Sequence, residues 1–260
     1  MIRTVLAWRI ALLPMLLLAG PAFGRGEAPV LPKQAVVASA HAAATDAGLE
    51  VLAAGGNAFD AAVAVSSTLG LVEPESSGLG GGGFALLHIA ADGRQVFVDA
   101  RERAPGAATR DMYLDADGEP RERLSVDGAL AAAIPGLPAA LEHLAENYGK
   151  LPLSRSLAPA IRLASEGWTF GPKNSELLRY RREVIARDPG AAALFLVDGK
   201  VPEPGTLMRN PDYARTLQLI ARHGADGFYR GEQATRLVGG VRAAGGIWSL
   251  ADLADYKVVE

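Results

Sequence analysis

The sequence predicts a fold of the α/β or α+β class, in which helices precede and follow a β-hairpin. Segments with a helical spacing of apolar residues lie on both sides of residues 84–100. Residues 84–100 themselves carry two short runs of β-type composition separated by turn residues. The chain has 260 residues, enough for a sizeable core as one large or two small domains. The order of helices, hairpin and helices predicts a layered arrangement.

Two helices are expected ahead of the hairpin. Residues 36–56, "VVASAHAAATDAGLEVLAAGG", are rich in Ala and Leu at helical spacing and end in two glycines, a common helix stop. Asn57 can cap a second helix over residues 58–73, which Pro74 terminates. Apolar residues run almost all round this second helix, so we expect it to be buried.

The hairpin is predicted from "FALLHIA", the turn "ADGR" and "QVFVDA". Residues 101–125 are irregular and surface-like in composition. Residues 135–168 have a mostly helical pattern that Pro and Gly residues interrupt. The pattern of residues 212–246 predicts two further helices. The final "YKVVE" is typical of the start of a strand, with nothing after it to pair with.

A glycine-rich loop joins the second helix to the hairpin. Residues 73–84, "EPESSGLGGGGF", hold five glycines. Residues 78–83 match G-x-G-x-x-G, but the dinucleotide motif follows a strand and opens a helix, whereas here a helix precedes and a strand follows. Ser76 and Ser77 lack a G-x-S-x-G frame, so we expect their hydroxyls to bond the loop backbone. The pattern therefore favours neither a nucleotide site nor a serine nucleophile.

Composition excludes several function classes. The net charge of −3 and the absence of a basic stretch argue against nucleic acid as a partner. The absence of cysteine excludes disulfides, thiolate metal sites and a cysteine nucleophile. The four histidines have no metal-ligand spacing, so no metal and no cofactor is predicted.

A signal peptide is predicted over residues 1–24. Two arginines precede an apolar run that is short and interrupted by proline, and Ala22 and Gly24 offer a small-residue cleavage site. Residues 25–35 are a polar, Pro-containing leader. We expect export to a bacterial periplasm or medium, with no membrane span in the mature chain; a retained N-terminal anchor is the alternative.

Two arginines lie where the second strand of the hairpin ends. In "VDARERAP", Arg101 and Arg103 flank Glu102. The guanidinium group suits a carboxylate, because it offers two parallel N–H donors. An ion pair at the surface is the alternative interpretation of these residues.

Long stretches of the chain resemble the γ-glutamyltransferase (γ-glutamyl transpeptidase) family. They include residues 49–84, "VDARERAPGAATRDMYLD", residues 133–168 and "SLADLADYKVVE", in register and in order from about Val36 to the last residue. The resemblance implies an αββα sandwich of the N-terminal-nucleophile hydrolase type, incomplete in this chain. Residues 36–260 would then be a truncated segment of the family's large chain.

The resemblance also implies an activity. Members of the family are made as one precursor that cuts itself into a large and a small chain. The new N-terminal threonine of the small chain takes the γ-glutamyl group of glutathione or related γ-glutamyl compounds as an acyl-enzyme and passes it to water or an amino acid. Carried onto this sequence, the residue that binds the substrate's α-carboxylate is Arg101, and the glycine loop packs close to the sheet.

The family's cleavage site carries a T-T-H-like run, and no threonine of this chain lies in one. The threonines are Thr4, Thr45, Thr68, Thr109, Thr169, Thr206, Thr216 and Thr235. We therefore expect no catalytic residue in this chain, no activity of the chain alone, and the small chain of the same precursor as its partner. The alternatives are a related acylase that cleaves glutaryl or cephalosporin side chains, and a non-catalytic remnant that acts at most as a binding module.

Overall fold

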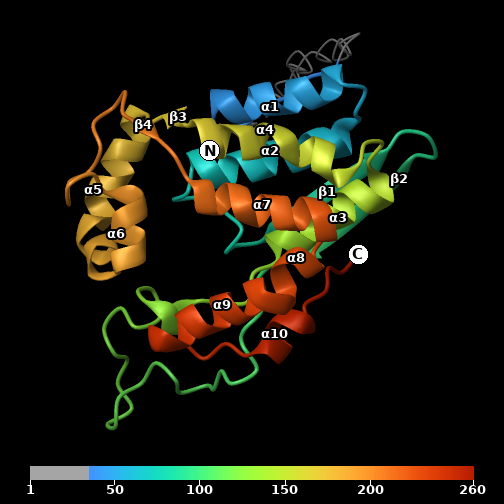
Figure 1. Ribbon diagram of the computed structural model, residues 1–260. Coiled ribbons are helices and arrows are strands. Elements are labelled where there is room, and N and C mark those ends of the chain that lie inside the picture. Colours follow the sequence, from blue (N-terminus) through green and yellow to red (C-terminus); the bar gives the residue numbers. More distant parts are fainter. Residues whose placement is uncertain (1–34) are drawn as a thin grey trace, which may run out of the picture. The chain divides into compact units, whose positions relative to one another are not determined.

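The computed structural model describes residues 35–260 (Figure 1). The predicted signal peptide, residues 1–24, lies outside the described residues, as does the predicted leader apart from residue 35. The described part is of the α+β class, because ten α-helices accompany two sheets of two strands each.

The elements follow the predicted order of helices, hairpin and helices. The first helix pair and the hairpin are α1 (Ala42–Ala53), α2 (Ala58–Val72), β1 (Gly83–Ile89) and β2 (Arg94–Ala100). A 3₁₀ turn, η1 (Ala129–Ala131), precedes α3 (Leu137–Tyr148), α4 (Leu153–Glu166), β3 (Trp168–Thr169), α5 (Pro172–Arg187) and α6 (Pro189–Phe195). The last elements are β4 (Leu207–Met208), α7 (Pro211–His223), α8 (Asp226–Tyr229), α9 (Gly231–Ala243) and α10 (Leu250–Ala254). No helix in the described part is both long and apolar enough to cross a membrane.

Helix α1 begins six residues later than predicted. The prediction placed its start at Val36, but His41 has extended backbone dihedrals and its Nδ1 accepts a hydrogen bond from the Ala43 N–H at 3.1 Å. The imidazole therefore acts as the N-cap, a role usually filled by Ser, Thr, Asp or Asn. The predicted end is confirmed, because Gly55 has φ +95° just after the helix.

Helix α2 starts with the capping predicted at Asn57. The Asn57 side chain accepts hydrogen bonds from the N–H groups of Phe59 and Asp60, and the Asp60 carboxylate accepts from the Asn57 N–H at 2.8 Å. This reciprocal capping box satisfies amide groups that the first turn leaves without helical partners. The helix packs against α1, α3 and α4, which confirms the prediction that it is buried.

The hairpin forms as predicted, with Leu87 opposite Val96 and Phe84 opposite Asp99. One face of the hairpin joins the core through Leu87 and Val98, and the other face is exposed. The final "YKVVE", predicted to be the start of a strand, pairs with an earlier part of the chain. Val259 pairs with Asp99 of β2, each N–H donating to the other's carbonyl oxygen at 2.7 and 3.0 Å.

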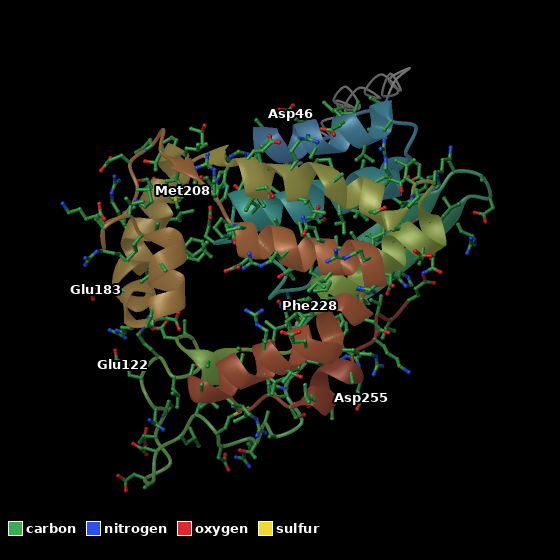
Figure 2. The ribbon with its side chains drawn as sticks, in the orientation of Figure 1. Asp46, Glu122, Glu183, Met208, Phe228 and Asp255 are labelled. Carbon is green, nitrogen blue, oxygen red and sulfur yellow. The ribbon has the colours of Figure 1, made fainter. Side chains whose placement is uncertain are left out.

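The main core lies between the hairpin and the helices α2, α3, α4, α7, α8, α9 and α10 (Figure 1). Leu141, Leu217 and Leu253 are fully buried there. Phe228 of α8 is buried in the same cluster, whereas charged residues such as Asp46 and Glu183 are exposed (Figure 2). This distribution follows the hydrophobic effect, since apolar area removed from water is the main favourable term in folding.

Helices α5 and α6 are joined to the rest of the described chain largely through polar contacts. Lys173 Nζ lies 2.7 Å from a carboxylate oxygen of the buried Glu73, and the Asn174 side chain donates to the Val72 carbonyl at 2.9 Å. Arg181 of α5 pairs with Asp127. Asn174 and Ser175 are the fully buried residues of α5, and α6 has none. A few polar side chains of α5 therefore connect this helix pair to the rest of the described chain.

The Asp127 anchor predicts an acid-dependent loss of stability. Arg123 and Arg181 hydrogen-bond the Asp127 carboxylate and lower its pKa from 3.8 to about 2. Because the folded-state pKa is the lower one, the stabilisation is complete above the unfolded pKa and is lost as the pH falls through the folded pKa. We expect Asp127→Asn to lower the midpoint of thermal unfolding at about pH 6, and the difference from wild type to vanish towards about pH 2. A difference that does not change with pH would contradict this assignment.

Candidate functional site

The glycine-rich loop between α2 and β1 runs along a cleft of about 700 Å³, which we call the loop cleft. Helices α2, α3, α6 and α7 and the end of β2 contribute its other walls. Its lining includes Pro74, Ser76–Phe84, Arg101, Glu102, Leu137, Leu194, Phe195 and Tyr213. The cleft therefore brings the two features singled out in the sequence, the glycines and Arg101, to one place.

The glycine loop passes very close to the end of β2 at Gly82. A Cβ atom at this position would lie 2.2 Å from the Ala100 carbonyl oxygen and 3.0 Å from the Glu102 nitrogen. Such distances exclude any side chain, so the predicted close backbone approach is confirmed at Gly82. It does not apply throughout the loop, because a Cβ at Gly80 or Gly83 would meet no atom within 4 Å.

The same loop occupies the N-terminus of α3. The Gly81 carbonyl oxygen accepts hydrogen bonds from the N–H groups of Gly136 and Leu137, at 2.8 and 2.9 Å. These are the amide groups at which a helix N-terminus would bind a phosphate. Because the loop's own carbonyl uses them, the G-x-G-x-x-G match has a structural role here, as its reversed context predicted.

Ser76 and Ser77 form a turn through their amides. Both N–H groups donate to the Glu73 carbonyl oxygen at 3.0 Å. Their hydroxyls make no hydrogen bond to residues 35–260, so the prediction that the hydroxyls bond the loop backbone is wrong. The turn is instead held by these backbone N–H groups.

Arg101 stands at the end of β2 with its guanidinium at the loop cleft. Its Nη1 lies 3.3 Å from Glu102 Oε2, and its side chain is 55% exposed. The guanidinium also lies over the Phe84 ring, 5.8 Å from the ring centre. Within the described residues it donates no hydrogen bond, although it carries five N–H donors. It can therefore bind a carboxylate that enters the cleft.

Arg103 has a different environment. Its Nη2 donates to the Lys257 carbonyl oxygen at 3.0 Å, and its guanidinium lies 5.2 Å from the centre of the Tyr256 ring. Its backbone forms an isolated bridge with Ile134. Arg103 thus fastens the segment after α10 to the hairpin and does not line the loop cleft.

The close approach at Gly82 predicts a sensitive position. We expect Gly82→Ala to lower the midpoint of thermal unfolding and to displace the Arg101 segment, because the added methyl group clashes with backbone atoms of Ala100 and Glu102. The matched control is Gly80→Ala in the same loop, where the added Cβ meets no atom within 4 Å. Equal effects of the two substitutions, measured by circular dichroism, would show that the contact at Gly82 is unimportant.

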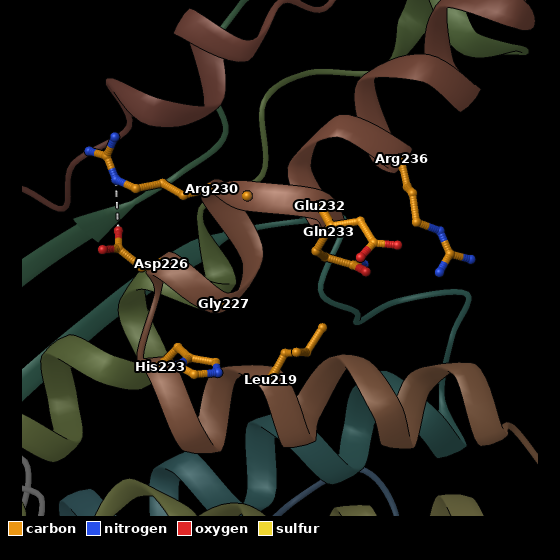
Figure 3. Close-up of a pocket in the computed structure, with 9 residues that line it drawn as sticks. Leu219, His223, Asp226, Gly227, Arg230, Glu232, Gln233 and Arg236 are labelled. Atoms are coloured by element: carbon orange, nitrogen blue, oxygen red, sulfur yellow. Dashed lines mark hydrogen bonds and ion pairs between the residues drawn. The ribbon is translucent and has the colours of Figure 1, made fainter.

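A second concavity of about 510 Å³ lies among α7, α8 and α9 (Figure 3). Its charged residues His223, Asp226, Arg230, Glu232 and Arg236 are all exposed. The Arg230 Nε atom pairs with Asp226 Oδ1 at 2.8 Å, within one helical turn. Exposed charged side chains of this kind stay hydrated, and an ion pair between them contributes little to the free energy of folding. The loop cleft is therefore the better candidate site.

No group of three or more His, Asp or Glu side chains within residues 35–260 is arranged to hold a metal ion. Two of the four histidines have other contacts. His41 caps α1, and His143 Nε2 lies 2.8 Å from a carboxylate oxygen of Glu260.

Several residues of the loop cleft were missed by sequence reasoning, among them two on α6 and a tyrosine on α7. Leu194 and Phe195 come from α6, and Tyr213 comes from α7. The Tyr213 hydroxyl donates to the Ser67 carbonyl oxygen at 2.7 Å, and burial raises the pKa of this tyrosine. These residues are more than 90 positions away from the glycine loop in the chain, and no local pattern marks them as neighbours of it.

Comparisons with known proteins agree on one family. A family model described as Gamma-glutamyltranspeptidase matches residues 44–260. The chain is 41% identical over 235 residues to the glutathione hydrolase proenzyme of Pseudomonas sp. (strain A14), covering 90% of this chain and 41% of that protein. It is 40% identical over 237 residues to the Acylase ACY 1 proenzyme of Pseudomonas sp. (strain SE83), covering 88% of this chain and 42% of that protein.

The solved structures give the same result. The Helicobacter pylori gamma-glutamyltranspeptidase matches with a TM-score of 0.85 and 38% sequence identity, over 89% of this chain and 66% of that chain. The chain spans less than half the length of these two proenzymes.

Proposed function

The chain belongs to the gamma-glutamyltranspeptidase family, an enzyme family, and we propose that it is part of an exported enzyme that transfers or hydrolyses the γ-glutamyl group of glutathione and related compounds. Its predicted fold class, that of the N-terminal-nucleophile hydrolases, is confirmed by the family's solved structures. The observation that carries the proposal is Arg101, whose guanidinium stands at the loop cleft with its donors unused by the described residues. Export rests on the signal-peptide pattern of residues 1–24.

Arg101 binds the α-carboxylate of the donor in this proposal. A planar guanidinium forms two parallel, charge-assisted hydrogen bonds with a carboxylate and so fixes its orientation as well as its position. The neighbouring Glu102 carboxylate keeps Arg101 at the cleft while no ligand is bound. The Glu102 Oε2 atom is buried and makes no hydrogen bond within the described residues. Glu102 and Arg101 therefore contact each other through the ion pair alone.

The nucleophile in this proposal is an N-terminal threonine that lies outside the 260 residues. Its hydroxyl oxygen attacks the γ-carbonyl carbon, and its α-amino group takes the proton and passes it to the departing amine. Water or the amine of an acceptor amino acid then attacks the acyl-enzyme and releases the threonine. The partner of this chain is accordingly the small chain of the same precursor, and the substrates are small γ-glutamyl compounds.

A related acylase is the second candidate, because one relative at 40% identity is named an acylase proenzyme. A glutaryl group has a terminal carboxylate that Arg101 could bind equally well. The two candidates differ in the α-amino group, which γ-glutamyl donors carry and glutaryl donors lack. A non-catalytic binding module is the third possibility, and turnover of either donor excludes it.

The test compares two donors on the enzyme purified from the complete precursor. We expect faster turnover of a γ-glutamyl anilide than of the corresponding glutaryl anilide. Preference for the glutaryl donor would favour the acylase, and turnover of neither would favour the binding module. Residues 25–260 expressed alone are expected to turn over neither donor, because the nucleophile is absent; turnover above the blank would contradict its proposed location.

A further inference from the structure

The loop cleft adjoins a second cavity, and Phe195 and Pro74 line both. The second cavity, which we call the rear cavity, has a volume of about 360 Å³ and lies between the start of the glycine loop and α5. Most of its lining is apolar, contributed by Phe170, Leu177, Leu178, Val184 and Ile185. Phe195, the last residue of α6, therefore stands as a partition between the two spaces.

The glycine loop lines the loop cleft from Pro74, which also lines the rear cavity, to Phe84, whose ring lies beside Arg101. At Gly82 the glycine loop touches the end of β2, where Arg101 follows Ala100. At Pro74 the same loop lies beside the rear cavity and Phe195. Arg101 and Phe195 line the same cleft, so a ligand whose carboxylate is bound at Arg101 and which extends along the loop as far as Pro74 would lie against Phe195.

Helix α6, which carries Phe195, is weakly packed. Helix α6 has no fully buried residue, and it packs mainly against α5. Phe195 itself is only partly buried. Protein interiors contain few voids larger than a water molecule, and an apolar cavity of about 150 Å³ is sufficient to bind benzene. The rear cavity consequently has room for an aromatic ring that moves back from the cleft.

We propose that Phe195 is a specificity-determining residue whose ring is displaced into the rear cavity by bulky apolar groups. The ligand class is γ-glutamyl donors whose leaving amine carries an aromatic or similarly large apolar substituent. This inference rests on the proposed function, since it takes the donor's carboxylate to lie at Arg101. Phe195 makes and breaks no bond; it sets how large a leaving amine the site accepts.

The test uses a substitution that fills the rear cavity and leaves the lining of the loop cleft unchanged. Val184 lines the rear cavity and not the loop cleft, so Val184→Phe removes the space behind Phe195. In the enzyme from the complete precursor, we expect this variant to lower kcat/KM for a γ-glutamyl naphthylamide roughly tenfold, with little change for γ-glutamyl methylamide. Phe195→Ala should shift the ratio of the two donors in the opposite direction, because it opens the cleft into the cavity.

The matched control is Val241→Phe on α9, a partly buried valine outside both cavities. It should leave the donor ratio unchanged. If the ratio of kcat/KM for the two donors is unchanged in both Val184→Phe and Phe195→Ala, the inference is overturned while the proposed function stands. If Val184→Phe does not fold, the donor ratio of Phe195→Ala alone tests the inference. Absence of turnover of either donor by the wild-type enzyme overturns the proposed function, and the inference with it.

Discussion

Replacing Arg101 with alanine is expected to lower kcat/KM for γ-glutamyl donors roughly ten- to over a hundredfold. The loss corresponds to a charge-assisted hydrogen-bonded pair, worth about 1.5–3 kcal/mol. Arg101→Lys should also weaken donor binding, because an ammonium group offers a point charge where a planar fork is needed. The measurement is steady-state kinetics with a γ-glutamyl anilide on the enzyme from the complete precursor.

Arg103→Ala is the matched control. Arg103 binds the Lys257 carbonyl and stacks on Tyr256, so its loss should lower the midpoint of thermal unfolding and leave kcat/KM nearly unchanged. A larger loss of kcat/KM in Arg103→Ala than in Arg101→Ala would reverse the assignment of the two arginines.

Replacing Asp60 with alanine is expected to lower the free energy of unfolding by about 3–5 kcal/mol, because three partly buried N–H groups lose their shared acceptor together. The carboxylate is fully buried and accepts hydrogen bonds from the N–H groups of Asn57, Lys150 and Leu151, at 2.8, 2.9 and 3.2 Å. It thus ties the start of α2 to the turn between α3 and α4.

Thermal unfolding followed by circular dichroism measures this effect. Asp46→Ala provides the control, because Asp46 is an exposed aspartate on α1, and surface substitutions of this kind change stability by about 0.5 kcal/mol or less. Similar midpoints for Asp60→Ala and Asp46→Ala would mean that the buried network contributes little.

Local features of the fold could be predicted from the sequence where a few neighbouring residues decide the outcome. The Asn57 cap, the stop at Gly55 and the turn of the hairpin depend on side chains and backbone within one turn of the chain. The start of α1 was mispredicted, because an imidazole served as the cap in place of a more usual residue.

Features that depend on distant segments could not be predicted in the same way. Val259 pairs with Asp99, 160 positions earlier, and the local pattern of "YKVVE" indicates a strand without indicating its partner. In the candidate site, Arg101 was found from its motif and the family resemblance. Leu194 and Phe195 of α6 were not, because packing of α5 and α6 beside the glycine loop brings them to the cleft.

The assignment of Arg101 to the donor's α-carboxylate is tested most directly by removing each partner in turn. The measurement is kcat/KM of wild type and Arg101→Ala for two donors, a γ-glutamyl anilide and the analogue that lacks only the α-carboxylate, 4-aminobutanoyl anilide. If the two groups bind each other, the wild-type enzyme loses roughly ten- to a hundredfold or more on the analogue, whereas Arg101→Ala turns over both donors at similar rates. An equal loss on the analogue in both enzymes would contradict the account, because the carboxylate would then be bound elsewhere.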